Sequence, residues 1–162
     1  MADVQTAQVK NTKNKALKKD YVAAVGRRRE AVARVRVYSH VKDDLVWADT
    51  PVKKGEILVN QRPIAEYFSS DVERHLYTEP LRITNAHQQQ FAITVKVTGG
   101  GHTGQLQAVI AGLANALNKL DTVKYRPILK KKGFLTRDSR IRQRRNVGMG
   151  GKSRRKRQSP KR

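Results

Sequence analysis

The sequence has no cysteine among its 162 residues, which excludes disulfides, thiolate chemistry and cysteine-ligated zinc. No apolar run approaches the ~20 residues that a membrane-spanning helix needs, so we expect no membrane partner. The four histidines are scattered, without the i, i+4 pair or neighbouring carboxylates of a metal site or an acid–base pair. No serine lies in the glycine pattern of a hydrolase nucleophile elbow. These absences predict a protein that is not an enzyme and has no cofactor, metal or small-molecule substrate.

Acidic residues are nearly absent from residues 122–162, which hold seventeen Lys and Arg against the single acid Asp138. The segment therefore carries +16 of the chain's formal net charge of +22. Residues 1–121 hold eighteen basic and twelve acidic groups, a net charge of only +6. A segment of this composition repels itself until a polyanion neutralises it. We predict a globular body at 21–121, a basic C-terminal extension at 122–162 and a nucleic acid as partner.

The start of the chain, residues 1–20, is polar and lacks both the apolar core of a secretory signal and the arginines of a mitochondrial presequence. We interpret it as a disordered arm and assign it no function. Together with the absence of cysteine, this composition fits a reducing cytosol.

Strand and helix periodicities alternate along the body. Alternation predicts strands at 33–38, with Arg34 and Arg36 facing outward, and at 91–97. Short apolar runs predict two further strands at 45–49 and 56–60. Apolar residues at helical spacing predict a long core helix from Thr103 to Leu120.

Local signals predict three shorter helices. Pro63 suits the first turn of one helix, and Ser70 and Glu73 have capping-box spacing at the start of a second, which Pro80 ends or kinks. Pro127 starts a third helix, which Gly133 closes as a left-handed cap. The fold class is therefore α+β, a two-layer sandwich with helices on one face of a sheet.

The glycine run between the strand at 91–97 and the long helix permits an anion site, because backbone N–H groups can approach a phosphate there. A nucleotide-hydrolysing loop is excluded, since Gln105 and Leu106 stand where Lys and Ser or Thr must be. Two interpretations remain, a tight turn alone or a turn that also meets an RNA phosphate. The residues concerned are Gly99, Gly100 and Gly101.

Arg27, Arg28 and Arg29 precede the strand at 33–38. A solvated charge cluster is one interpretation, and phosphate contact is favoured because arginine binds phosphate bidentately. Asp138, flanked by basic residues, is expected to orient an arginine through a local ion pair.

The extension lacks aromatic residues after Phe134, so we expect phosphate contact and arginine stacking to supply the affinity, with recognition of RNA shape rather than of base sequence. The alternative is a nonspecific tether or a localisation signal. The candidate RNA-binding residues are Lys130, Lys131, Lys132, Arg137, Arg140, Arg142, Arg144, Arg145, Lys152, Arg154, Arg155, Lys156 and Arg157.

Four motifs occur in a familiar order: GRRREAVARVRV from Gly26, GEILVNQRPIAEYF from Gly55, GGGHTGQLQAVIAGLANAL from Gly99 and GFLTRDSR from Gly133. Over residues 21–162 they closely resemble the bacterial-type family of universal ribosomal protein nine of the small subunit. The resemblance implies a fold like the second domain of small-subunit ribosomal protein five, with a left-handed βαβ crossover that departs from the usual handedness.

The same resemblance implies a function in the cytoplasmic ribosome. The body would bind ribosomal RNA in the head of the small subunit, beside neighbouring head proteins. The extension would reach the peptidyl-site tRNA through Ser159, Lys161 and Arg162. Three departures bear on this transfer. Asn115 stands where the family usually has arginine, and residues 1–20 have no firm counterpart. The usual ending is an aromatic residue followed by Ser-Lys-Arg, whereas here Pro160 precedes Lys161 and changes the approach of the last two residues.

Two other classes of nucleic-acid-binding protein fit the sequence less well. The protein subunit of ribonuclease P is similar in fold and strongly basic, but that family places its basic residues chiefly in the folded body. A DNA-compacting protein ranks last, because the sequence has neither a recognition helix nor an evident dimer seam.

Overall fold

The computed structural model describes residues 21–39, 46–47, 50–86 and 91–144. The predicted N-terminal arm and the end of the extension lie outside these residues. In chain order the elements are β1 (Tyr21–Arg28), β2 (Ala31–Tyr38), β3 (Val46–Trp47), β4 (Thr50–Pro51), β5 (Ile57–Val59), β6 (Arg62–Pro63), α1 (Ile64–Tyr67), α2 (Asp71–Ile83), β7 (Ala92–Thr98), α3 (His102–Leu120) and α4 (Thr122–Lys131).

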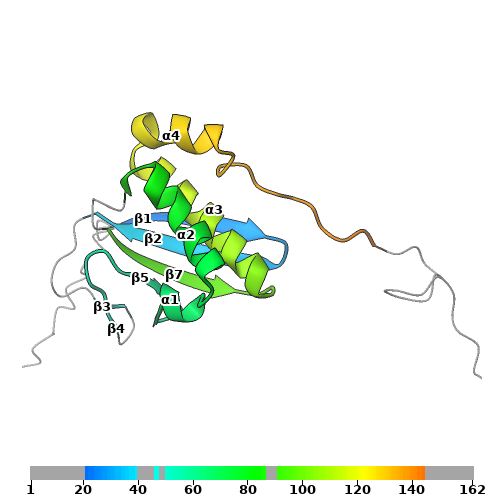
Figure 1. The fold of residues 1–162 in the computed structure, drawn as a ribbon, viewed down its shortest axis with the longest axis horizontal. Coiled ribbons are helices and arrows are strands. Elements are labelled where there is room, and N and C mark those ends of the chain that lie inside the picture. The colour runs from blue at the N-terminus through cyan, green and yellow to red at the C-terminus, as the bar shows by residue number, and fades with distance from the viewer. Residues whose placement is uncertain (1–20, 40–45, 48–49, 87–90, 145–162) are drawn as a thin grey trace, which may run out of the picture.

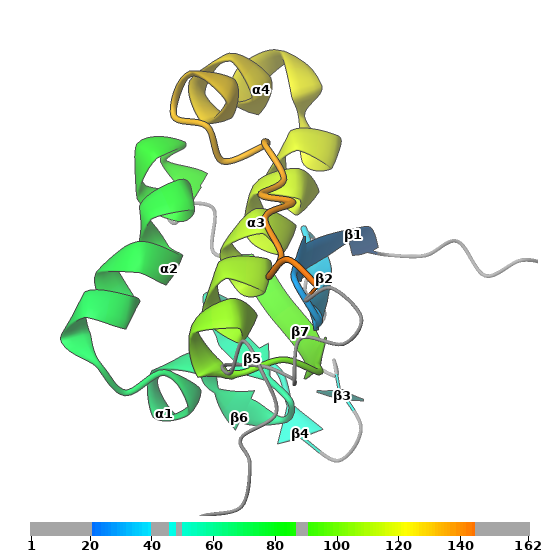
Figure 2. The same ribbon diagram turned by 90° about the vertical axis from the view of Figure 1, so that its right-hand side faces the viewer.

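Five strands form a mixed sheet in the order β1-β2-β7-β5-β6, and β3 pairs with β4 separately. Neighbouring strands are antiparallel except β5 and β7, which run parallel and are connected through α1 and α2. Helices α2 and α3 lie on one side of the sheet, and α4 lies across the end of α3 (Figures 1 and 2). The predicted α+β class is confirmed. The closer likeness to a domain of ribosomal protein five, with its crossover handedness, stays a prediction.

The main core lies between the sheet and α3. Its strand residues alternate, as in Val35 and Val37 of β2 and in Val95 and Val97 of β7, and all four are buried. On α3 the predicted stripe is buried at Leu106, Val109, Leu113 and Leu117, while Ile110 and Leu120 pack partly buried against it. The strand predicted at 91–97 and the long helix are thus confirmed, with shifts of one residue at their starts.

The first part of the body, residues 21–38, forms a hairpin of two strands. The strand predicted at 33–38 is β2, and the preceding residues form the antiparallel partner β1, with Gly26 opposite Ala33. Arg34 and Arg36 face solvent as predicted. Tyr38, which shares their face, is only 8% exposed because it packs in a second cluster that includes Val52.

The capping box predicted at the start of α2 is wrong. Ser70 is the N-cap residue, but its side chain makes no capping hydrogen bond. The expected partner Glu73 instead lies 3.0 Å from the Nδ1 atom of His102 at the start of α3. Helix α2 does not end at Pro80 but continues to Ile83, and the alternative that Pro80 kinks the helix stays a prediction.

Helix α4 begins five residues earlier than predicted. Asp121 caps it by accepting a hydrogen bond from the backbone N–H of Lys124 at 3.0 Å, and Pro127 lies inside the helix. The predicted cap at Gly133 is confirmed, with φ of 78°. Because Tyr125 and Leu129 are buried, the first ten residues of the predicted extension pack with the body.

Candidate nucleic-acid interface

The glycine turn lies directly against the β1–β2 turn. Gly99 and Gly100 have φ values of 72° and 66°, in the left-handed region where a side chain is strained. A Cβ on Gly99 would overlap the carbonyl oxygen of Glu30, and one on Gly100 would lie 2.8 Å from the Cβ of Ala31. Gly101, the N-cap of α3, has open space around it. Packing therefore accounts for the first two glycines, and phosphate contact at this turn stays a prediction.

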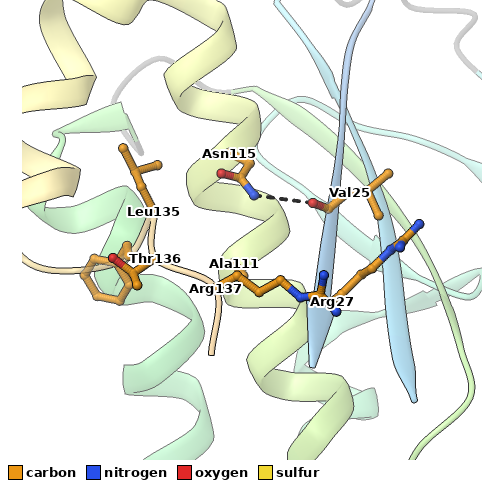
Figure 3. Close-up of a pocket in the computed structure, with 8 residues that line it drawn as sticks. Val25, Arg27, Ala111, Asn115, Leu135, Thr136 and Arg137 are labelled. Carbon is orange, nitrogen blue, oxygen red and sulfur yellow. Dashed lines mark hydrogen bonds between the residues drawn. The ribbon is translucent and has the colours of Figure 1, made fainter. Parts of the chain in front are cut away.

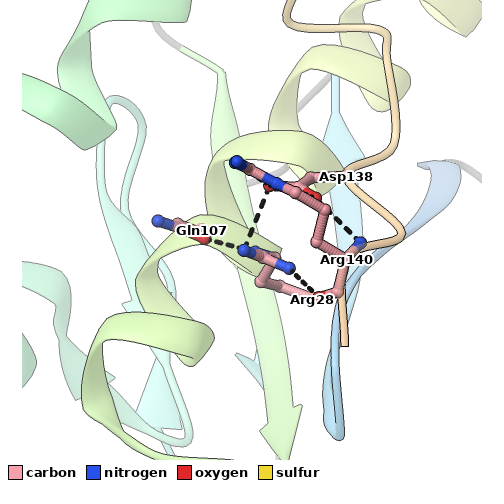
Figure 4. A network of polar contacts seen from close by, with 4 residues as sticks. All are labelled: Arg28, Gln107, Asp138 and Arg140. Atoms are coloured by element: carbon pink, nitrogen blue, oxygen red, sulfur yellow. Dashed lines mark hydrogen bonds and ion pairs between the residues drawn. The ribbon is translucent and has the colours of Figure 1, made fainter. Parts of the chain in front are cut away.

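Arg28 anchors the chain that leaves α4 (Figure 4). Its Nη1 donates to the carbonyl oxygen of Arg140 at 2.8 Å, and its Nη2 lies 3.0 Å from Oδ2 of Asp138. Its Nε donates to Oε1 of Gln107 on α3 at 2.7 Å. The Arg28 side chain is 12% exposed. Three of its five N–H donors are therefore used within the protein. We call Arg28, Gln107, Asp138 and Arg140 the clamp, and RNA contact by Arg28 stays a prediction.

Asp138 is the acid of this clamp. The guanidinium of Arg140 contacts its carboxylate at 2.8 Å from Nη2, and the backbone N–H of Arg140 donates to Oδ1 at 2.9 Å. These hydrogen bonds, together with the attraction of Arg140 and Arg28, hold the pKa of Asp138 well below its ordinary value. The prediction that Asp138 orients an arginine is confirmed, and Arg28, 110 positions away in the sequence, is a second partner.

The remaining candidates in the structure divide into three exposed groups. Arg27 lies in β1 and Arg29 in the adjoining turn, where its φ is 51°. The second group ends α4 and consists of Lys130, Lys131 and Lys132. The third follows Gly133 and consists of Arg137, Arg140, Arg142 and Arg144. The candidates outside the described residues are Arg145, Lys152, Arg154, Arg155, Lys156, Arg157, Ser159, Lys161 and Arg162.

Two side chains of α3 donate hydrogen bonds to carbonyl oxygens of β1, a feature that the sequence did not indicate. Nζ of Lys119 donates to the carbonyl oxygen of Ala23 at 3.0 Å, and Nδ2 of Asn115 donates to that of Val25 at 3.3 Å. Lys119 and Asn115 are one helical turn apart, and the two carbonyls alternate along the strand. Their spacing could have suggested a shared helix face, but nothing in the sequence identified β1 as their partner.

Within the described part of the chain, no three His, Cys, Asp or Glu side chains gather as a metal site. No helix there is both long and apolar enough to cross a membrane. The arrangement instead offers cations on β1, at the end of α4 and along the segment after it.

Comparison with known proteins assigns the family. The family model described as ribosomal protein S9/S16 matches residues 26–162. A curated relative, the small ribosomal subunit protein uS9 of Leifsonia xyli subsp. xyli (strain CTCB07), is 38% identical over 127 residues, which cover 78% of this chain and 67% of the relative. Ribosomal proteins of this family are structural, so the prediction that the chain is not an enzyme is confirmed. The chain belongs to the ribosomal protein S9/S16 family.

Proposed function

We propose that this chain is a structural component of the small ribosomal subunit in the cytoplasm, where it binds ribosomal RNA in the subunit head beside neighbouring head proteins. The extension reaches the peptidyl-site tRNA. The observation that carries the RNA contact is the cationic segment after α4, in which Arg137, Arg140, Arg142 and Arg144 are exposed. Residues 137–162 hold twelve basic residues and one acid, and the acid is held by Arg28 and Arg140.

The clamp gives this segment a fixed starting direction. Arg28 is itself held between β1 and Gln107 of α3, so its bonds to Asp138 and to the carbonyl of Arg140 tie the extension to the rigid body. A chain with a fixed starting direction has fewer conformations to lose when it enters an RNA groove. The clamp thus holds the extension to the body at Asp138 and Arg140.

Asp138→Asn tests the clamp because its two effects on RNA affinity are opposite: the added positive charge raises the affinity, and the loss of the anchoring contacts lowers it. The substitution raises the net charge by one, so electrostatics alone would tighten RNA binding. We expect weaker binding to a fragment of small-subunit ribosomal RNA, because the anchoring ion pairs are lost. Asp121→Asn makes the same charge change and keeps a good helix cap, and it should not weaken binding. Equal effects of the two variants would contradict the role of the clamp.

The phosphate contacts are tested by the salt dependence of RNA affinity. Each neutralised phosphate contributes roughly −0.9 to the slope of log affinity against log salt on a duplex. In a variant with glutamine at Lys152, Arg154, Arg155, Lys156 and Arg157, the magnitude of that slope should fall by up to about 4.5.

A matched control removes five exposed cations of the body instead, at Lys53, Lys54, Arg62, Arg74 and Arg82. Its slope should change much less. Equal changes in the two variants would count against the extension as the main RNA contact.

The tRNA contact requires a separate test at the tip of the chain. A photo-crosslinker placed at Arg162 in assembled small subunits should crosslink to peptidyl-site tRNA. Crosslinks to ribosomal RNA alone would refute this contact while leaving the RNA-binding role intact.

A further inference from the structure

A cavity of about 290 Å³ lies between β1, α3 and the chain that follows α4 (Figure 3). A second cavity of about 220 Å³ adjoins it, and the two share Arg27, Ala111, Phe134 and Arg137 among their lining residues. Together they form one groove, called here the β1–α3 groove. Helix α3 forms one side of this groove and packs closely against β1.

The first cavity combines apolar walls with cations. Val25, which is 46% exposed, and the partly buried Phe134 and Ala111 supply apolar surface. Arg27 and Arg137 are exposed at the same cavity, and no acidic residue lines it. An exposed valine and an aromatic ring beside two guanidiniums form a surface that can accept a flat apolar group with negative charge attached.

A hydrogen-bonding group of fixed orientation faces the same space. Asn115 donates from Nδ2 to the carbonyl oxygen of Val25, so its Oδ1 is turned away from the strand, as Figure 3 shows. Oδ1 has no hydrogen-bond partner in the part of the chain that the structure describes. It can accept a hydrogen bond from a ligand.

We propose that the β1–α3 groove binds the base of an unpaired nucleotide of RNA, with the attached phosphate between Arg27 and Arg137. The inference rests on the proposed function, since it assumes that the chain binds RNA. Unpaired bases are recognised by stacking on aromatic rings or guanidinium planes and by hydrogen bonds to their edges. A phosphate alone would leave the apolar walls unused, and an apolar side chain of another protein would leave both guanidiniums unused. The occupant that uses all three features is a nucleotide.

The test compares two single-stranded probes with the full-length chain at fixed salt: an oligoadenylate of about twelve nucleotides and an abasic ribose-phosphate oligomer of the same length. The two probes carry the same phosphates and differ only in the bases. Stacking of one base contributes about tenfold in affinity, so the oligoadenylate should bind roughly tenfold more tightly because of the groove.

Ala111→Leu fills the groove without changing any charge. It should abolish most of the tenfold preference for bases and leave the salt slope unchanged. Phe134→Leu removes the ring but keeps an apolar side chain and should lower the preference in the same way. The control is Ala65→Leu on α1, an exposed alanine away from the groove, which should behave as the unsubstituted chain.

A preference for bases that persists in both groove variants would overturn the inference, because the bases would then bind elsewhere. Equal binding of the two probes by the unsubstituted chain would also overturn it. Neither result touches the salt slope, on which the proposed RNA-binding function depends.

Discussion

Gly26→Ala is expected to destabilise the protein strongly, because β1 and α3 approach each other backbone to backbone at this residue. An added Cβ would overlap the carbonyl oxygen of Ala108 and the backbone nitrogen of Gly112, and would lie 2.8 Å from the Cα of Gly112. Carbon atoms in contact normally lie about 3.5–4.0 Å apart, so the strand must move away from the helix by about 1 Å. Neither backbone can rotate aside as a side chain would.

The free-energy cost follows from this geometry. Overpacking of a core costs about 1–3 kcal/mol, and we expect about 3 kcal/mol here because both partners are backbone. Gly112→Ala should cost less, since its nearest neighbour is a side-chain methyl group of Val35 at 2.6 Å and alanine is the better helix former.

Gly104→Ala is the matched control, on the helix α3 against which Gly26 packs. A Cβ at this position would make an ordinary contact with Ala31 at 3.7 Å, so the substitution should stabilise the protein by about 0.5–1 kcal/mol. Urea denaturation of the variants measures all these free energies of unfolding. If the free energy of unfolding of Gly26→Ala lies within about 0.5 kcal/mol of that of the unsubstituted chain, the reasoning on the β1–α3 contact is refuted.

Two further predictions concern helix capping and pH. Asp121→Ala should cost about 1 kcal/mol, because its side chain caps α4, whereas Ser70→Ala should cost only a few tenths, because Ser70 makes no such bond; urea denaturation showing the reverse order would contradict this. Burial raises the pKa of Tyr77 above its ordinary value of 10.0, an effect that Arg74 partly offsets. The stability that this shift provides is complete below about pH 10 and is lost as the pH rises through the raised pKa. In unfolding measured against pH, Tyr77→Phe should therefore lose less stability than the unsubstituted chain at alkaline pH, and an identical profile would count against the burial effect.

Long periodic segments were predictable from the sequence, and contacts between distant segments were not. The strand at 91–97 and the helix that became α3 each bury a continuous stripe, so their apolar spacing alone indicates their type. The hairpin of β1 and β2 was missed because its turn includes Arg29, a residue other than glycine at positive φ. Turn rules that look for glycine or asparagine do not find it.

Helix α4 illustrates how tertiary packing overrides a local signal. Pro127 locally predicts a helix start, but its missing N–H is tolerated inside the helix, which is capped by Asp121 and anchored by the buried Tyr125 and Leu129. At Gly133 the local signal and the structure agree. The backbone N–H of Phe134 bonds to the carbonyl oxygen of Leu129, and that of Gly133 to the carbonyl oxygen of Lys130, as in a Schellman motif.

The candidate interface was predictable as a set of charges but not as an arrangement. Clusters of Arg and Lys are visible in any sequence, so the exposed cations at the end of α4 could be named in advance. The clamp joins Arg28 to Asp138, which is far away in the sequence. Gln107, which also bonds to Arg28, has no distinguishing sequence signal. The sequence predicts Arg28 as an RNA-binding residue, which stays a prediction, and the structure adds its anchoring contacts to Asp138 and Arg140.

Sedimentation of the tagged full-length chain in a ribosome gradient tests the central claim most directly. The chain should migrate with small ribosomal subunits, and the variant with glutamine at the five basic positions between Lys152 and Arg157 should incorporate less efficiently. A chain that stays at the top of the gradient, in cells where its expression is confirmed, would contradict the proposed function.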